Sequence, residues 1–203
     1  MTWAIIIITA IFSIMAFQNN GLMYKYQFNP YQAYHRKQYY RFLTHAFLHV
    51  DWTHLLFNMI TLFFFGRYVE QAYISDFGNS GIFFYVILYF FAIVISSLPS
   101  FIKHRNDHTY NSIGASGAVS AVLFTYILFE PFGKIYIFFI PIGIPAIIFG
   151  VLYLIYSAYM ARKNMDNIGH DAHFWGAVFG FVFPMFVEPR LFNDFISSIM
   201  KIF

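Results

Sequence analysis

The residues best suited to chemistry in this sequence are a serine, two histidines and an asparagine. Ser116 stands between small residues in Gly114-Ala-Ser-Gly117, at the start of an apolar run. A serine hydroxyl becomes a nucleophile when a base removes its proton, and histidine, here His173, is the usual base near neutral pH. His54 and Asn58 are four residues apart, so a helix would place both on one face, where each could donate a hydrogen bond to an oxyanion.

The chain that must position these residues is strongly apolar. Of its 203 residues, 60% are hydrophobic and 10% are charged, whereas a soluble domain carries roughly 25% charged residues. Too few charges are present to cover a globular surface, so we predict an all-α polytopic membrane protein. The lack of cysteine excludes thiol catalysis and cysteine-bound metal, and a net charge of +3 gives no sign of nucleic-acid binding.

Membrane-spanning helices need about 20 mostly apolar residues. Six runs approach this length and predict a six-transmembrane-helix bundle: Met1–Phe17, His54–Tyr68, Gly81–Leu98, Ile113–Phe129, Ala146–Met160 and Asp171–Val187. The first run lacks a basic start and a clear cleavage site, so we expect a retained span rather than a removed signal peptide. The stretch Lys134–Ile144 contains helix breakers and is expected to be a connector. We expect residues 1–203 to form a single membrane domain.

Two segments are expected to lie along the membrane surface. The connection Gln18–Thr53 mixes tyrosines with lysines and arginines, a composition typical of the headgroup zone, and predicts a long interfacial loop between helices 1 and 2. The tail, residues 188–203, has apolar residues at helical spacing and is expected to be an amphipathic interfacial helix.

The alternating direction of successive spans brings the chemical residues to one end of the bundle. The second, fourth and sixth spans run the same way, so their N-terminal ends share one side of the membrane. His54, Asn58, Ser116 and His173 all lie in the first turns of these spans. We therefore expect them at similar depth.

Small residues provide for close packing of the fourth and sixth spans. They occur four apart on each helix, at Gly117 and Ala121 and at Gly176 and Gly180. This spacing lets membrane helices approach to backbone contact, which would bring Ser116 and His173 together.

Other interpretations of the same residues stay open at this point. Gly-Ala-Ser-Gly also occurs where membrane helices merely cross, and membrane histidines could serve a small proton-coupled transporter. A metal site formed by His45, His49 and His54 is disfavoured because no His-Glu-x-x-His motif is present. Arg67 and Glu70, three residues apart, are expected to form a local pair or an anchor.

A resemblance covers the chain from about Tyr40 to Phe183. The sequence resembles rhomboid-family intramembrane serine proteases of the basic six-span bacterial form. The matching pieces are Arg41-Phe-Leu-Thr-His45-Ala-Phe-Leu-His49, His54-Leu-Leu-Phe-Asn58 with Gly66 and Glu70, Gly114-Ala-Ser116-Gly117, and Ala172-His173-Phe-Trp-Gly176 followed by Gly180. One departure is Tyr40, where the family usually has tryptophan.

The resemblance implies a role for each matching residue. Ser116 would be the nucleophile and His173 the base of a Ser-His dyad, because Asp171, two residues away, points elsewhere on a helix. His54, Asn58 and the Ser116 backbone would form the oxyanion hole. Arg41 and Glu70 would hold the interfacial loop and its surroundings in shape.

The resemblance also implies the reaction and its partners. Such a protein cleaves transmembrane segments of membrane protein substrates within the lipid bilayer, without a cofactor or metal. Substrates would enter between the second and fifth spans, beneath the loop Arg162–Gly169. The alternative is a rhomboid-like pseudoprotease that binds membrane helices without cutting them, but such a protein would lack the serine or the histidine.

Orientation in the membrane is the point on which two arguments conflict. The connections 17–53, 99–112 and 161–170 hold eight of the twelve lysines and arginines, so the positive-inside rule places the catalytic end in the cytoplasm. The resemblance implies a multi-pass protein of the cell membrane whose active site opens to the extracytoplasmic side. We expect the latter, because several of these basic residues belong to the interfacial loop rather than to free tethers.

Overall fold

The computed structural model describes residues 1–137, 141–163 and 168–201. Its long helices are α1 (Thr2–Phe17), α5 (Trp52–Thr61), α6 (Arg67–Phe77), α7 (Gly81–His104), α8 (Ser116–Phe129), α9 (Ala146–Lys163), α10 (His170–Val187) and α11 (Arg190–Met200). The part of the chain that the structure describes is all-α apart from a two-stranded antiparallel pair, β1 (Lys134–Ile135) with β2 (Ile144–Pro145), at the predicted connector. The all-α prediction is therefore confirmed.

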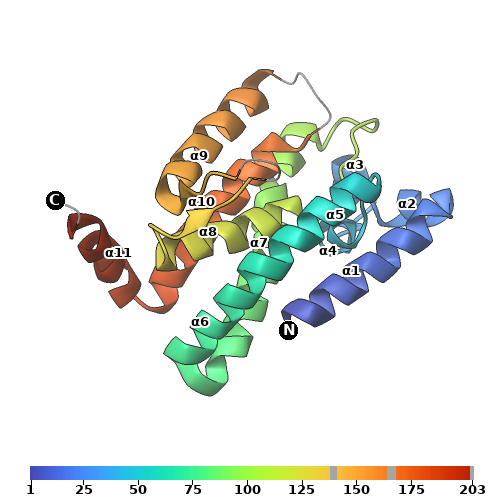
Figure 1. Cartoon of the computed structure of the whole chain (residues 1–203). Coiled ribbons are helices and arrows are strands. Elements are labelled where there is room, and N and C mark those ends of the chain that lie inside the picture. Colours follow the sequence, from blue (N-terminus) through green and yellow to red (C-terminus); the bar gives the residue numbers. More distant parts are fainter. Residues whose placement is uncertain (138–140, 164–167, 202–203) are drawn as a thin grey trace.

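Helix α8 is the centre of the bundle, with α7, α9 and α10 around it (Figure 1). From Gly117 to Leu128 every residue of α8 except Tyr126 is buried. An interior helix needs no polar face, which explains why α8 is apolar on all sides. Its most extensive contact is with α10.

The segment predicted as the second span is longer than expected. Helix α5 continues through a wide π-helical turn, η2 (Leu62–Gly66), into α6, and the short 3-10 turn η3 (Gly78–Ser80) then leads into α7. The predicted end at Tyr68 was too early, because Glu70 and Asp76 interrupt the apolar run without interrupting the helix.

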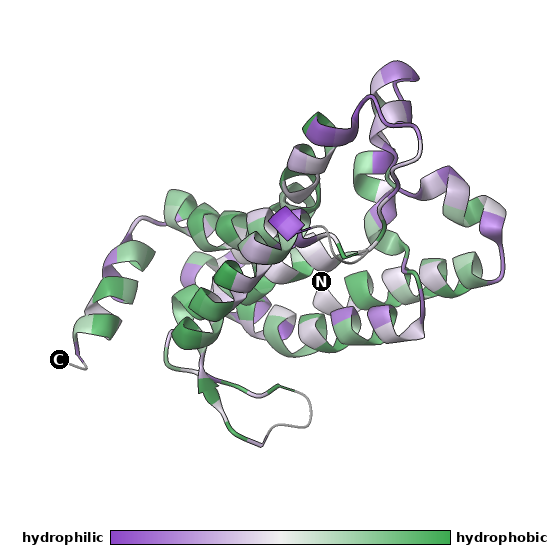
Figure 2. Ribbon diagram, turned by 90° about the horizontal axis from the view of Figure 1, so that it is seen from above, coloured by the Kyte–Doolittle hydropathy of each residue, from purple (hydrophilic) through white to green (hydrophobic). Residues whose placement is uncertain are grey.

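Within the described residues, two helical stretches are long and apolar enough to cross a membrane by length and composition, the continuous run Trp52–His104 and α9. Helices α1 and α8 are apolar but shorter. Figure 2 shows hydrophobic residues along the long helices and hydrophilic ones concentrated in the loops and short helices.

The connection between α1 and α5 folds into short helices rather than an open loop. These are α2 (Asn20–Tyr26), α3 (Pro30–His35), α4 (Arg41–Thr44) and the 3-10 turn η1 (His45–Phe47). The side chains of Asn19 and Asn29 cap α2 and α3 by accepting hydrogen bonds from backbone N–H groups. We call this segment, residues 18–51, the α1–α5 connection.

Arg67 and Glu70, expected to form a local pair or an anchor, do not pair with each other. Among the described residues, Glu70 pairs with the amino group of Met1 and accepts a hydrogen bond of 2.8 Å from the backbone nitrogen of Thr2. The Arg67 guanidinium instead lies over the Phe63 ring, 5.3 Å from its centroid. Glu70 thus contacts a distant part of the chain, and Arg67 contacts the preceding turn of its own helix. The three-residue spacing of Arg67 and Glu70 indicated neither contact.

Candidate active site

The four side chains singled out in the sequence line one cavity. Its volume is about 920 Å³, and its lining includes Ser116 and Gly117 at the start of α8, His173 near the start of α10, and His54 and Asn58 from α5. The helices therefore bring together residues separated by more than a hundred positions. The cavity is the candidate active site.

Gly117 is the point where α7, α8 and α10 meet. A Cβ added at Gly117 would lie 2.2 Å from the Ser96 Oγ of α7, and one added at Gly176 would lie 2.1 Å from the Gly117 carbonyl oxygen. One turn further along, a Cβ at Gly180 would lie 2.0 Å from the Ala121 carbonyl oxygen. The predicted backbone contact between α8 and α10 is confirmed. It fixes the distance between the helices that carry Ser116 and His173.

Gly114 makes room for His54 beside the serine. Its φ of +123° is a conformation that side chains rarely adopt, and a Cβ there would lie 2.7 Å from the His54 ring. Its N–H donates a 3.0 Å hydrogen bond to the His45 carbonyl oxygen. Glycine is therefore required at this position both by backbone conformation and by space.

The N-terminus of α5 is held by Asp51. Its Oδ1 accepts a 2.7 Å hydrogen bond from the His54 backbone nitrogen, an N-cap that sets where the helix begins. Asn58 donates through Nδ2 to the His54 carbonyl oxygen at 3.2 Å. These local bonds orient the first turns of α5 toward the cavity.

His49 supports His54 from outside the cavity. The two rings lie edge to face with centroids 4.8 Å apart, and Ser13 of α1 lies 2.9 Å from His49 Nδ1. Because Ser13 donates its proton to the Phe47 carbonyl oxygen, Nδ1 of His49 is the donor to Ser13. Burial, reinforced by the neighbouring His54, lowers the pKa of His49 to about 3, so this ring stays neutral.

His45 is a second buried histidine beneath the site. Its Nε2 lies 3.1 Å from the Ser97 Oγ of α7. Burial lowers the pKa of His45 to about 4. The described residues contain no group of three histidine, cysteine or acidic side chains able to hold a metal ion. His45 contacts Ser97, and His49 contacts Ser13 and His54.

A family model described as Rhomboid domain matches residues 36–190, a stretch that contains all the residues lining the cavity from His45 to His173. The chain belongs to the rhomboid family. Rhomboids are membrane-embedded helical proteins, so the helices described above form a membrane bundle.

Individual rhomboid relatives match the same part of the chain. It is 30% identical over 144 residues to "RHOMBOID-like protein 12, mitochondrial" of Arabidopsis thaliana, covering 66% of this chain and 42% of the relative. It is 31% identical over 142 residues to "Rhomboid protease GluP" of Bacillus subtilis, covering 70% of this chain and 25% of the relative. The matched stretch thus spans less than half of the length of these relatives.

Arg41, which the family pattern assigns to loop support, bonds within the α1–α5 connection. The guanidinium donates to the carbonyl oxygens of Tyr24 and Gln27 at 3.0 and 2.6 Å and to the side chains of Gln38 and Gln32 at 2.7 and 3.2 Å. Glu70, the other support residue of the pattern, lies at the far end of the bundle, beside the start of α1. The two residues therefore act on separate parts of this rhomboid.

The α1–α5 connection is also tied to the loop that leads into Ser116. Asn29 Nδ2 donates to the carbonyl oxygens of His108 and Tyr110 and to Asn111 Oδ1, and Phe28 pairs with Ser112 through two backbone hydrogen bonds of 2.9 Å. These bonds hold the rim of the cavity.

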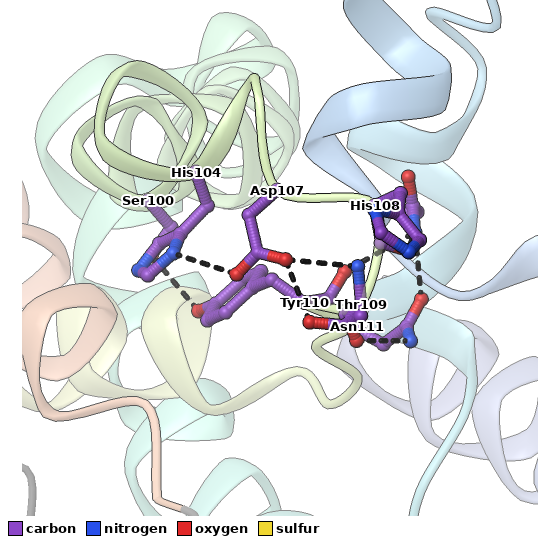
Figure 3. Close-up of polar contacts among 8 residues, drawn as sticks. Ser100, His104, Asp107, His108, Thr109, Tyr110 and Asn111 are labelled. Carbon is purple, nitrogen blue, oxygen red and sulfur yellow. Dashed lines mark hydrogen bonds and ion pairs between the residues drawn. The ribbon is translucent and has the colours of Figure 1, made fainter.

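The same loop is ordered by short-range contacts after α7 (Figure 3). The His104 and Tyr110 rings are stacked with centroids 3.8 Å apart. Asp107 accepts hydrogen bonds from the backbone and side chain of Thr109, at 2.9 and 2.6 Å, and these bonds lower the pKa of the Asp107 carboxyl. These contacts order the part of the cavity lining that His104, Thr109 and Tyr110 form.

Sequence reasoning did not single out the residues that support the site from a distance. Ser13, Ser97 and Ser120 are serines within apolar runs, and Tyr153 is a polar-tipped ring in the middle of α9. A polar group within an apolar run is costly to bury unless it forms a hydrogen bond. This cost was the one sign in the sequence that these residues have partners. Their partners lie on other helices, and the sequence does not name them.

Proposed function

We propose that this rhomboid is an intramembrane serine endopeptidase that cleaves transmembrane segments of membrane protein substrates. The observation that carries the proposal is the lining of one cavity by Ser116, His173, His54 and Asn58, with the helices of Ser116 and His173 in backbone contact. A serine beside a histidine base, facing hydrogen-bond donors, is the arrangement that acyl transfer requires.

In the proposed mechanism, Ser116 Oγ attacks the carbonyl carbon of the scissile peptide bond while His173 takes the hydroxyl proton. The side chains of His54 and Asn58, with the backbone N–H groups in the first turn of α8, stabilise the oxyanion. His173 then gives its proton to the leaving amine, and the acyl group stays on Ser116. A water molecule activated by His173 hydrolyses this ester and restores the hydroxyl.

The proposed membrane arrangement is based on the long helices. We propose that α1, the α5–α6 run, α7, α8, α9 and α10 make six crossings, that α11 lies along the membrane surface, and that residues 1–203 form one membrane domain. Several of these helices approach the length of about 20 residues that a crossing needs. The active site would open to the extracytoplasmic side of a cell membrane.

Substrate access is proposed to lie between α5 and α9. Helix α9 buries only Ala146, Gly150 and Ser157 completely, so it is a peripheral element that a substrate helix could pass. In the loop Arg162–Gly169, expected to cap this entry, residues 164–167 lie outside the described residues.

The deciding experiment incubates the purified protein with a reporter transmembrane substrate. Wild type should cleave it and should be labelled at Ser116 by a fluorophosphonate probe. Ser116→Ala and His173→Ala should each abolish cleavage while keeping the helical circular dichroism spectrum of wild type. Cleavage by Ser116→Ala at the wild-type rate would rule out the proposed nucleophile.

A further inference from the structure

Tyr153 of α9 contacts both of the helices that carry the proposed dyad. Its hydroxyl lies 2.6 Å from the Ser120 Oγ of α8. Its ring is stacked with the His173 imidazole of α10, with centroids 6.3 Å apart and planes 26° apart. A single side chain on a third helix therefore links the surroundings of the nucleophile to the base.

The hydrogen bonds around Ser120 have a defined direction. Ser120 Oγ donates its only proton to the Ser116 carbonyl oxygen, at 2.8 Å. It must therefore accept from Tyr153, whose hydroxyl is the donor. This relay runs from Tyr153 through Ser120 to the peptide group of Ser116, one helical turn away.

The Tyr153 ring is held on its other sides as well. Phe124 of α8 and Phe149 of α9 lie against it, with centroids 5.5 and 5.9 Å away. Both its hydroxyl and its ring are thus fixed, so the face it presents to His173 has a defined orientation.

We infer that Tyr153 is a positioning residue for His173, anchored by Ser120, and that the base is aligned only while α9 is docked against α8 and α10. This inference rests on the proposed proteolytic function. An imidazole free to rotate would spend less time oriented toward the serine hydroxyl, and a misplacement of about 1 Å can cost about 10²-fold in rate. Peripheral α9 would thereby contribute to catalysis by orienting His173.

The experiment compares variants that remove the ring, the hydroxyl or the anchor. Tyr153→Leu, Tyr153→Phe, Ser120→Ala and the double variant Ser120→Ala/Tyr153→Phe are each measured by fluorophosphonate labelling of Ser116 and by kcat and KM on the reporter substrate. Tyr159→Leu is the matched control, because Tyr159 lies on the same helix but is half exposed, at 56%. Thermal unfolding is recorded for every variant.

Tyr153→Leu should slow labelling and lower kcat by about tenfold or more, with KM within about twofold of wild type. Tyr153→Phe keeps the ring and should recover most of this loss. Because Ser120→Ala and Tyr153→Phe remove the same hydrogen bond, the double variant should be no slower than the slower single one. Tyr159→Leu should match wild type.

Three results would overturn the inference. Labelling of Tyr153→Leu at the wild-type rate would show that the ring does not align the base. An equal loss in Tyr159→Leu, or a loss that follows only KM and thermal stability, would assign the effect to general packing of α9. If wild type itself neither cleaved nor labelled, the proposed function would fail first, an outcome distinct from failure of a Tyr153 variant alone.

Discussion

Gly176 of α10 packs directly on the backbone of Gly117 in α8, so closely that a Cβ at position 176 would lie 2.1 Å from the Gly117 carbonyl oxygen. No real Cβ contact is that short, and the obstacle is main chain rather than a flexible side chain. Any larger residue must separate the two helices. The contact lies beside Ser116 and one turn from His173, so separation there changes the candidate active site directly.

Gly176→Ala should therefore reduce both stability and proteolysis. Overpacking of this kind typically costs about 1–3 kcal/mol, and the proposed dyad would be pulled apart as the helices separate. The measurement is thermal unfolding together with reporter cleavage.

Gly150→Ala is the matched control for this substitution. Its Cβ would meet the Ile127 Cδ1 at 3.0 Å, the end of a flexible side chain that is able to move. Both changes replace a helical glycine by alanine, so helix propensity cancels between them. Equal stability of the two variants would show that the contact between α8 and α10 tolerates a methyl group.

The proposed oxyanion donors should show graded losses of activity. One lost donor typically costs about 10²–10³ in rate, so His54→Ala and Asn58→Ala should each keep more activity than Ser116→Ala. The double variant should be slower than either single one. Steady-state kcat on the reporter substrate is the measurement, and full turnover in both single variants would place the oxyanion hole elsewhere.

Stability should fall in mild acid because of His45. Burial lowers its folded pKa to about 4 from the ordinary 6.5, so between these values the unfolded chain binds a proton that the folded protein refuses. The free energy of unfolding keeps the full contribution of neutral His45 above pH 6.5 and loses about 3 kcal/mol of it as the pH falls to 4.

His45→Gln provides the comparison for this pH dependence, since it removes the titrating ring at that position. The free energy of unfolding of wild type and of the variant, measured from pH 7 to pH 4, should differ in slope. His49 is present in both proteins, so its effect on the pH dependence cancels in the comparison. Parallel pH curves would show that the ring is able to take up a proton without unfolding.

Membrane orientation is testable by cysteine labelling, because the chain has no native cysteine. Asn106 is exposed in the loop after α7, on the active-site side, and Ser75 is exposed near the opposite end of the bundle. In intact cells, an impermeant maleimide should label Asn106→Cys and not Ser75→Cys. The reverse pattern would place the active site in the cytoplasm, as the positive-inside count suggests.

The sequence by itself determined the helices and the identity of the chemical residues. Local hydropathy placed α10 within one residue of its observed bounds, with Asp171–Val187 expected and His170–Val187 found. The small residues at 117, 176 and 180 predicted a close helix contact because their spacing is a local signal. The sequence also indicated the candidate site residues, Ser116, His173, His54 and Asn58. Polar side chains in or beside apolar membrane segments are costly to bury, so they are candidates for function.

Only the tertiary structure decided which side chains support that chemistry. Tyr153 meets Ser120 across 33 positions and Ser13 meets His49 across 36, and no local pattern encodes such pairs. Glu70 bonds to the start of α1 instead of its neighbour Arg67 for the same reason. Hydropathy sets where a helix runs, but the partner of a buried polar group depends on how all the helices pack together.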